Sequence, residues 1–382
     1  MKKRGVLGTA ASMTRRDALR LGGGAGLGLV AALGVPVSLV DAEAQAPSPA
    51  AGRRPSIPSW KTELRQLAPG VYAYVQAGGP EMYRTFIPES LNQFDNGSVS
   101  NAGVVVGERD LLAIDALAAP LHAKAFIAAA TNATGKTFGR LVNTHHHGDH
   151  TNGNQFFLPA EIVSHEFCRE EVLRAIASRE PGATFGKREF WADGTEVRVA
   201  APPVTTFPNK ISYLYGSTVV ELLFLGIGHT WGDIVAYLPQ HRILFAGDLT
   251  FNLVTPSVHN GHTTKWIEVL DTIMAMDVDT IVPGHGPIHG KKEVAVLRDY
   301  FVILKREARK RFDVGMSIGR AAADIDMGMY EVWTNPERNV RNVLRLYDEF
   351  NDTIVPAFDS ARNNVALEEY RTLRAPSSGR TR

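Results

Sequence analysis

The stretch His145-His146-His147-Gly148-Asp149-His150 is the most informative part of the sequence for the fold. Its pattern, His-x-His-x-Asp-His, places three imidazoles and a carboxylate within six residues. A hydrophobic core tolerates so many polar groups only when they are paired or coordinated. Neutral imidazole nitrogen and carboxylate oxygen are zinc ligands. The stretch therefore predicts a metal site, and we expect His146, the middle residue of the triplet, to point away from it.

Further candidate ligands follow other apolar runs along the chain. Each of four predicted strands is followed by His or Asp: residues 140–143 by the histidine cluster, 219–225 by His229, 242–246 by Asp248 and 280–282 by His285. Loops at strand ends carry function because a rigid scaffold positions them. Packing alone does not explain the repeated placement of these residue types, which favours one shared site.

Other elements complete an α/β pattern up to about residue 290. Apolar runs predict a hairpin of strands over 103–106 and 111–115, and helices over 120–130, 165–178 and 264–276, with Thr263 or Thr264 as the N-cap of the last. Beyond residue 290 the pattern becomes helical. An apolar stripe runs through Val294, Leu297, Phe301 and Leu304, and another helix is predicted over 339–350.

The His-x-His-x-Asp-His stretch and the order of the later ligands resemble the metallo-β-lactamase superfamily over about residues 67–290. The resemblance implies an α/β fold, the αββα metallo-β-lactamase sandwich, here with a C-terminal helical extension. It also implies two zinc ions. His145, His147 and His229 would hold the first, Asp149, His150 and His285 the second, and Asp248 would bridge both.

Two zinc ions imply a hydrolase in which a metal-bridged hydroxide attacks a carbonyl-type bond of a small molecule: an ester, lactone, thioester or β-lactam amide. Asp149 would orient the nucleophile and pass its proton to the leaving group, so Asp149 and Asp248 are the candidate catalytic residues. Nitrogen and oxygen ligands also suit iron or manganese. A β-lactamase proper, an iron-dependent persulfide-type dioxygenase on the same fold, and a non-catalytic metal-binding protein remain alternatives.

Three residues outside the motif have two interpretations each. Asp115 ends a predicted strand, where it is either a partner that orients a ligand or an ordinary strand-end acid. His259 and His262 lie in the loop after Asp248, and we expect them to face solvent, with substrate contact as the alternative. The helices after residue 290 either cover the site and select the substrate or serve as a packing or dimerisation surface.

Composition excludes several classes of protein. Cys168 is the single cysteine of the 382 residues, so an internal disulfide framework and a cysteine-based zinc cluster are excluded. Lys and Arg number 41 against 40 Asp and Glu, a balance that provides no basic footprint for nucleic acid. We therefore expect a small-molecule substrate and no nucleic-acid partner. Homo-oligomerisation stays open.

The N-terminal residues predict export. Arg15 and Arg16 precede a stretch of Gly, Ala, Leu and Val up to about Val40, which resembles a twin-arginine signal over residues 1–44. A Pro- and Ala-rich linker is expected over 45–60, the metal domain over 61–290 and the helical extension over 291–382. This organisation predicts recognition by the twin-arginine export machinery, no stable membrane insertion after signal removal, and a periplasmic or secreted protein.

Overall fold

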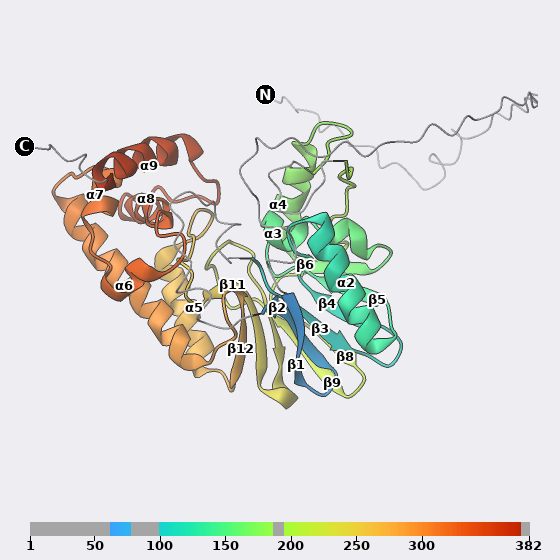
Figure 1. Ribbon diagram of the computed structural model, residues 1–382. Coiled ribbons are helices and arrows are strands. Elements are labelled where there is room, and N and C mark those ends of the chain that lie inside the picture. Colours follow the sequence, from blue (N-terminus) through green and yellow to red (C-terminus); the bar gives the residue numbers. More distant parts are fainter. Residues whose placement is uncertain (1–61, 78–98, 186–194, 376–382) are drawn as a thin grey trace, which may run out of the picture. The chain divides into compact units, whose positions relative to one another are not determined.

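The computed structural model describes residues 62–77, 99–185 and 195–375 (Figure 1). The chain divides into two units, Met1–Gly52 and Arg53–Arg382, and all described residues lie in the second. The signal predicted over 1–44 and the linker predicted over 45–60 lie outside the described residues. The domain boundaries therefore stay predictions.

Two β-sheets form the centre of the second unit. The first has the order β1-β2-β3-β4-β5-β6-β7 and the second the order β12-β11-β10-β9-β8. The strands of the first sheet are β1 (Thr62–Ala68), β2 (Val71–Gln76), β3 (Ala102–Val106), β4 (Leu111–Ile114), β5 (Phe138–Val142), β6 (Glu161–His165) and β7 (Thr205–Phe207). Those of the second are β8 (Lys210–Tyr215), β9 (Thr218–Leu223), β10 (Val235–Leu238), β11 (Ile243–Phe251) and β12 (Thr280–His285).

Helices connect the parallel strands and extend the chain beyond the sheets. Parallel pairing of β4 with β5, β6 with β7 and β11 with β12 requires crossover segments, which contain α2, α4 and α5 respectively. The helices are α2 (Pro120–Thr134), α3 (Gly148–Thr151), α4 (Glu166–Ala177), α5 (Thr263–Ala275), α6 (Lys291–Asp313), α7 (Ile318–Asp324), α8 (Arg338–Phe350) and α9 (Ser360–Arg374). Short 3-10 turns are η3 (Asn154–Phe157), η4 (Pro239–His241) and η5 (Gly328–Val332). The predicted helices and the predicted hairpin are confirmed, with ends shifted by a few residues.

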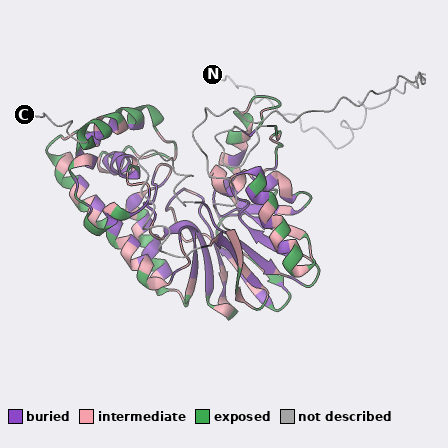
Figure 2. Cartoon of the chain, viewed as in Figure 1, coloured by how far each residue is buried: buried purple, intermediate pink, exposed green. Residues whose placement is uncertain are grey.

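Alternating side chains place each sheet between two apolar layers. In β4, Leu112 and Ile114 pack between the sheets, while Leu111 and Ala113 face the core that includes Phe126 of α2. In β11, residues 243 and 245 face the first sheet, and residues 244 and 246 share a core with helices α5 to α9. Buried residues accordingly fill both sheets and the inner helix faces in Figure 2. The layers are helix, sheet, sheet and helix, which confirms the predicted αββα sandwich with C-terminal helices.

The predicted N-cap of α5 is wrong. The helix starts at Thr263 with His262 as its N-cap residue, and the His262 side chain makes no capping hydrogen bond. The carboxylate of Glu349 on α8 instead accepts from the backbone N–H of Thr263 and from that of Thr264 (3.2 Å for the latter). The first N–H groups of α5 thus donate to a carboxylate that is distant in sequence, whereas in most helices they donate to a local cap residue.

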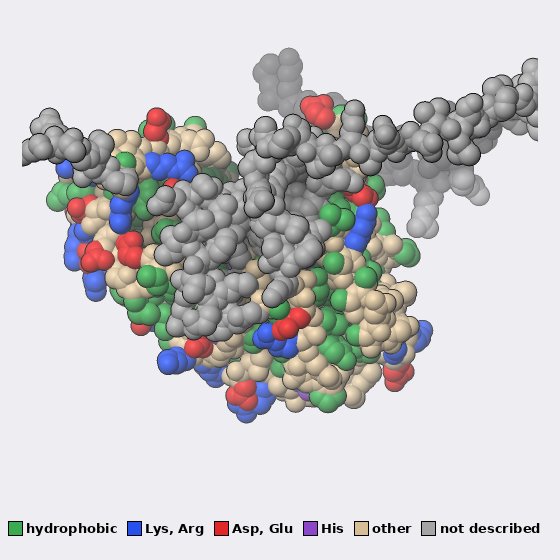
Figure 3. Space-filling model, viewed as in Figure 1, with side chains coloured by type: hydrophobic (Ala, Val, Ile, Leu, Met, Phe, Trp, Pro, Cys, Tyr) green, Lys and Arg blue, Asp and Glu red, His purple; other side chains and the backbone are tan. Residues whose placement is uncertain are grey.

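The face of the described chain that is visible in Figure 3 is mixed in charge. On the face in Figure 3, acidic and basic side chains are interspersed and neither sign forms a broad patch. Within residues 62–77, 99–185 and 195–375, no helix has the length and apolar character required to cross a membrane. The predicted absence of a nucleic-acid partner stays a prediction.

Candidate metal centre

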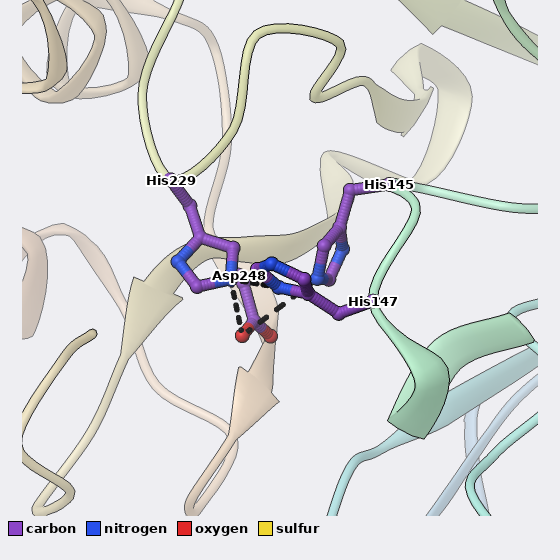
Figure 4. Close-up of side chains that lie close together, drawn as sticks. All are labelled: His145, His147, His229 and Asp248. Atoms are coloured by element: carbon purple, nitrogen blue, oxygen red, sulfur yellow. Dashed lines mark hydrogen bonds and ion pairs between the residues drawn. The ribbon is translucent and has the colours of Figure 1, made fainter. Parts of the chain in front are cut away.

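The seven predicted ligands come from five segments and meet at one edge of the two sheets. The loop after β5 carries His145 and His147, and short helix α3 carries Asp149 and His150. His229 lies in the loop between β9 and β10, Asp248 within β11, and His285 at the last residue of β12. Figure 4 shows the imidazoles of the two loops turned toward the carboxylate of Asp248. The structure therefore brings together residues that are up to 140 positions apart in the chain.

One group of donor atoms comprises His145, His147, His229 and Asp248, within 4.8 Å of one another. His147 Nδ1 lies 2.7 Å from His229 Nε2. His229 Nε2 lies 3.1 Å from Asp248 Oδ2, and His145 Nε2 lies 3.9 Å from the same oxygen. This is the arrangement of one compact cation site with three nitrogen donors and one oxygen donor.

A second group comprises Asp149, His150 and His285. His285 Nε2 lies 3.1 Å from Asp149 Oδ2. Asp248 also faces this group, because its Oδ1 lies 3.1 Å from His150 Nε2 and its Oδ2 lies 3.5 Å from His285 Nε2. The carboxylate of Asp248 therefore stands between the two groups, where it could contact two cations. His146 belongs to neither group.

Hydrogen bonds on the far side of each ring determine which nitrogen faces the centre. His229 Nδ1 donates to Ser257 O (2.6 Å), and His147 Nε2 donates to Asn260 Oδ1 (3.0 Å). The two nitrogens that face each other at 2.7 Å are then both unprotonated in neutral rings, and their lone pairs repel unless a cation or a proton lies between them. This arrangement fits a metal ion that accepts both lone pairs.

Buried atoms at the centre lead to the same conclusion. Among the described residues, His145 Nε2, His150 Nε2 and Asp248 Oδ1 are buried and make no hydrogen bond, and the last two atoms face each other at 3.1 Å, which is an ion pair only when His150 is protonated. Buried polar atoms are normally paired, because an unpaired one loses its hydration without compensation. Two imidazole nitrogens and a carboxylate oxygen are the donor types that zinc prefers. The residues present fit metal coordination.

Asp115 orients two of these rings. His150 Nδ1 donates to Asp115 Oδ2 (2.7 Å), and Thr144 Oγ1 donates to the same oxygen (2.8 Å). The Thr144 hydroxyl has only one proton, which it donates to Asp115. In the 3.1 Å contact between Thr144 Oγ1 and His145 Nδ1, the ring N–H is therefore the donor. Asp115 is thus the orienting partner that the sequence offered as one of two interpretations. Ser257, Asn260 and Thr144 were missed, and only their position next to predicted site residues could have indicated them.

The electrostatics differ between the two groups. Burial lowers the pKa of His229 to about 3, and burial with nearby His150 lowers the pKa of His145 well below 6.5. These rings are neutral, the form that coordinates metal. Burial also opposes the charged form of His285, but Asp248 and Asp149 raise its pKa to about 9. The carboxylates of Asp248 and Asp149 therefore attract positive charge, which a divalent cation would supply.

Two glycines allow the strands to approach each other at the centre. The sequence predicted Asp248 beyond the end of a strand, and this is wrong. Strand β11 continues to Phe251, so Asp248 lies inside it. The pairing of β11 with β12 shifts register around Gly247, whose φ is +51° and which a side chain would strain. A Cβ at Gly284 would lie 1.8 Å from Asp248 Oδ1. Gly284, before His285, thus leaves room for the Asp248 carboxylate, and Gly247, before Asp248, leaves room for the Thr144 side chain.

The solvent-facing position predicted for His259 and His262 is wrong. The His259 ring stacks on His147 with a centroid distance of 4.3 Å, and its Nδ1 lies 2.8 Å from Ser257 Oγ. His262 precedes α5 and lies 3.4 Å from Glu349 Oε1. The reason is that α8 contacts the loop, through Asn342 and Arg341, and both histidine side chains are only partly exposed. Local sequence does not reveal this contact.

Comparisons with known proteins agree with this geometry. A family model described as the metallo-beta-lactamase superfamily matches residues 95–285. A linear primary-alkylsulfatase of Pseudomonas sp. is 27% identical over 194 residues, covering 42% of this chain and 36% of that protein. A hydroxyacylglutathione hydrolase of Methylococcus capsulatus is 27% identical over 153 residues, covering 40% of this chain and 50% of that protein. The chain thus spans half or less of the length of these relatives.

One solved structure shares the fold over most of the chain. The stereoselective inverting sec-alkylsulfatase Pisa1 from Pseudomonas sp. matches with a TM-score of 0.55 at 16% identity, over 76% of this chain and 50% of that chain. At this identity the likeness concerns the fold alone.

Proposed function

The chain belongs to the metallo-β-lactamase superfamily, and we propose that it is a metal-dependent hydrolase of small molecules. His145, His147 and His229 would hold one ion, Asp149, His150 and His285 a second, and Asp248 both. The observation that carries the proposal is the position of Asp248, whose Oδ1 lies 3.1 Å from His150 and whose Oδ2 lies 3.1 Å from His229. Zinc is the proposed metal, with two ions per chain.

Two bound cations would lower the pKa of a water molecule and polarise the scissile oxygen. The chain supplies the proton transfer. The side chain of Asp149 is 27% exposed, whereas those of His145 and His150 are fully buried, so Asp149 lies where solvent and substrate reach the centre. Its Oδ2 lies 3.1 Å from His285 Nε2. We assign to Oδ1 of Asp149 the acceptance of the proton from the attacking water and its donation to the leaving group.

The bond proposed is of the carbonyl type, in an ester, lactone, thioester or β-lactam. Hydrolysis of sulfuric esters is a second candidate, because a relative with 27% identity is a linear primary-alkylsulfatase. Both reactions need a nucleophilic water and a polarised oxygen, and the residues described above serve either.

The test combines metal analysis with a substrate panel. Purified protein is expected to contain about two zinc ions per chain and to hydrolyse one class among aryl esters, lactones, a glutathione thioester, a chromogenic cephalosporin and alkyl sulfates. Dialysis against a chelator should abolish the rate, and added zinc should restore it. About one iron per chain together with no hydrolysis would contradict the proposal and favour the dioxygenase alternative.

Export is a further proposal, which rests on Arg15, Arg16 and the apolar stretch that follows them. Expression in a Gram-negative host should yield protein in the periplasm that begins near residue 45, as N-terminal sequencing would show. Arg15→Lys with Arg16→Lys should retain the protein in the cytoplasm, because the twin-arginine machinery recognises the pair. Cleaved periplasmic protein from the double variant would contradict this route.

A further inference from the structure

The loop between β11 and α5 orients two histidines of the first ligand group. Ser257 O accepts from His229 Nδ1 (2.6 Å), and Asn260 Oδ1 lies 3.0 Å from His147 Nε2. Both contacts are made on the far side of the rings, so the opposite nitrogens, His229 Nε2 and His147 Nδ1, face each other at 2.7 Å. The position of this loop therefore sets which ring nitrogens are offered to a cation.

The amide of Asn260 can take only one orientation. Its Nδ2 donates to Pro356 O (2.9 Å), and a backbone carbonyl can only accept. The atom that faces His147 is then the amide oxygen, which also can only accept. Nε2 of His147 therefore carries the proton, and Nδ1 has the lone pair that coordinates. The tautomer of His147 thus depends on Pro356, a residue of the C-terminal extension that lies 96 positions beyond Asn260.

A side chain of α8 holds the other part of the same loop. Asn342 is fully buried, and its Oδ1 accepts from Val258 N (2.9 Å) while its Nδ2 donates to Pro256 O (2.9 Å). These two partners flank Ser257, whose carbonyl orients a ligand. Asn342 Nδ2 also donates to Tyr300 Oη on α6 (2.8 Å). The loop is therefore fixed to two helices of the extension through one buried amide.

Two further ligand histidines are oriented from within the metal domain. His145 Nδ1 donates to Thr144, and His150 Nδ1 donates to Asp115 beside β4. The contacts that run through the loop to the extension end instead on His147 and His229, which belong to the same group of donor atoms.

We propose that the C-terminal extension completes the first cation site, because Asn342 and Pro356 hold the loop acceptors that orient His229 and His147. Asn260 and Asn342 are then positioning residues, which touch no cation themselves. The inference rests on the metal binding of the proposed function and not on hydrolysis of any substrate. It gives the extension a role in metal affinity, distinct from substrate selection and dimerisation.

Zinc binding to the purified full chain tests this role, measured by nuclear magnetic resonance of isotope-labelled histidine in chelator-buffered zinc solutions. The ring nitrogen signals report the two groups separately: His145, His147 and His229 for the first, His150 and His285 for the second. In Asn260→Leu, half-occupancy of the first group should require about 10–100-fold more free zinc, as for other lost orienting partners. The change at the second group should be much smaller. Asn260 is a partly exposed loop residue, so this variant should fold.

Asn260→Asp is the conservative variant that separates hydrogen bonding from packing of the loop. Its carboxylate still accepts from His147 Nε2, and it needs no partner to orient it because both of its oxygens are acceptors. We therefore expect most of the zinc affinity to be retained. A loss as large as that in Asn260→Leu would contradict the role of Asn260 as an acceptor.

Asn342→Ala extends the test to the helices. It leaves Val258 N and Pro256 O without their partner, and it should weaken the first group about tenfold through His229. The matched control is Asn363→Ala, because Asn363 is a buried asparagine of α9 whose Oδ1 has no hydrogen-bond partner among the described residues. It should leave the zinc affinity of both groups unchanged.

Wild-type affinity of the first group in either Asn260→Leu or Asn342→Ala would overturn the inference, as would an equal loss at both groups or in Asn363→Ala. If wild-type protein binds no zinc, the proposed function fails separately. The ring spectra of the metal-free protein then decide the inference. We expect the proton of His147 on Nε2 in wild type and a changed tautomer in Asn260→Leu, and the same tautomer in both proteins would refute it.

Discussion

Replacing Asp248 by Asn is expected to lower kcat/KM well beyond a hundredfold and to reduce bound zinc from about two ions per chain to one or none. The variant replaces one carboxylate oxygen with an NH2 group, which cannot coordinate a cation, and removes the negative charge between the two groups of ligands. Asp248 contacts both groups at 3.1 Å, through Oδ1 and Oδ2. Loss of partners outside the coordination shell already costs about 10–100-fold, so loss of a shared ligand should cost more.

Metal content by mass spectrometry after dialysis and the rate with saturating zinc measure this effect. Asp271→Asn is the control, because Asp271 is a half-exposed acid that pairs with Arg298 on the surface, and such pairs contribute little to stability. It should retain two zinc ions and the full rate. Wild-type zinc content and activity in Asp248→Asn would remove Asp248 from the centre.

Replacing Asp115 by Asn should weaken zinc binding about 10–100-fold, although the side chain keeps its size. In the native protein Asp115 Oδ2 accepts from His150 Nδ1, so His150 Nε2, which faces Asp248, is the nitrogen that would coordinate zinc. An amide NH2 at this position would donate to Nδ1, so the proton would move to Nε2 and block the nitrogen that coordinates. In serine proteases, an analogous Asp-to-Asn change drops kcat about 10⁴-fold through the wrong tautomer.

Competition with a chromophoric chelator gives the zinc affinity of this variant, and thermal unfolding shows whether the fold persists. Asp233→Asn is the matched control. Asp233 is equally buried, and it accepts from Thr230 N (2.7 Å) and Thr230 Oγ1 (2.6 Å); an amide can accept from the first and donate to the hydroxyl oxygen of the second. Burial raises the pKa of Asp233 to about 7, so an uncharged side chain is already tolerated there. Equal zinc affinities for Asp115→Asn and wild type would show that Asp115 does not set the tautomer of His150.

Much of the fold could be predicted because the relevant signals are local. Strands such as β4 and β5 are continuous apolar runs, and the stripe from Val294 to Leu304 repeats at helical spacing over a stretch that forms α6. The ligands were predicted from residue type, spacing and order, since core packing does not account for repeated histidine and aspartate beside buried strands. The structure brings all seven together, and their metal-binding role stays a proposal.

Other features escaped prediction because they depend on packing between distant segments. Glu349 pairs the N-terminus of α5 from 86 residues away, so the local search for an N-cap at Thr263 or Thr264 failed. His259 has the appearance of a loop residue in the sequence, yet its ring stacks on His147 and contacts the ring of Phe358, which lies 99 residues further along the chain. The sequence did not show that Asp248 lies within a strand. The register shift at Gly247 arises only when β11 pairs with β12.

Neighbouring positions in the sequence were enough to predict the strands, the helices and the residues that converge on the candidate metal centre, because strand periodicity and a dense cluster of histidine and aspartate are local patterns. The αββα architecture was implied by the family resemblance that these residues carry. Tertiary packing was needed to set which nitrogen of each histidine faces inward and which groups orient each ring. Those outcomes depend on contacts such as that of His147 with Asn260, 113 residues apart. Hydrogen bonds of this range form only after the sheets and α8 have packed, so no local pattern encodes them.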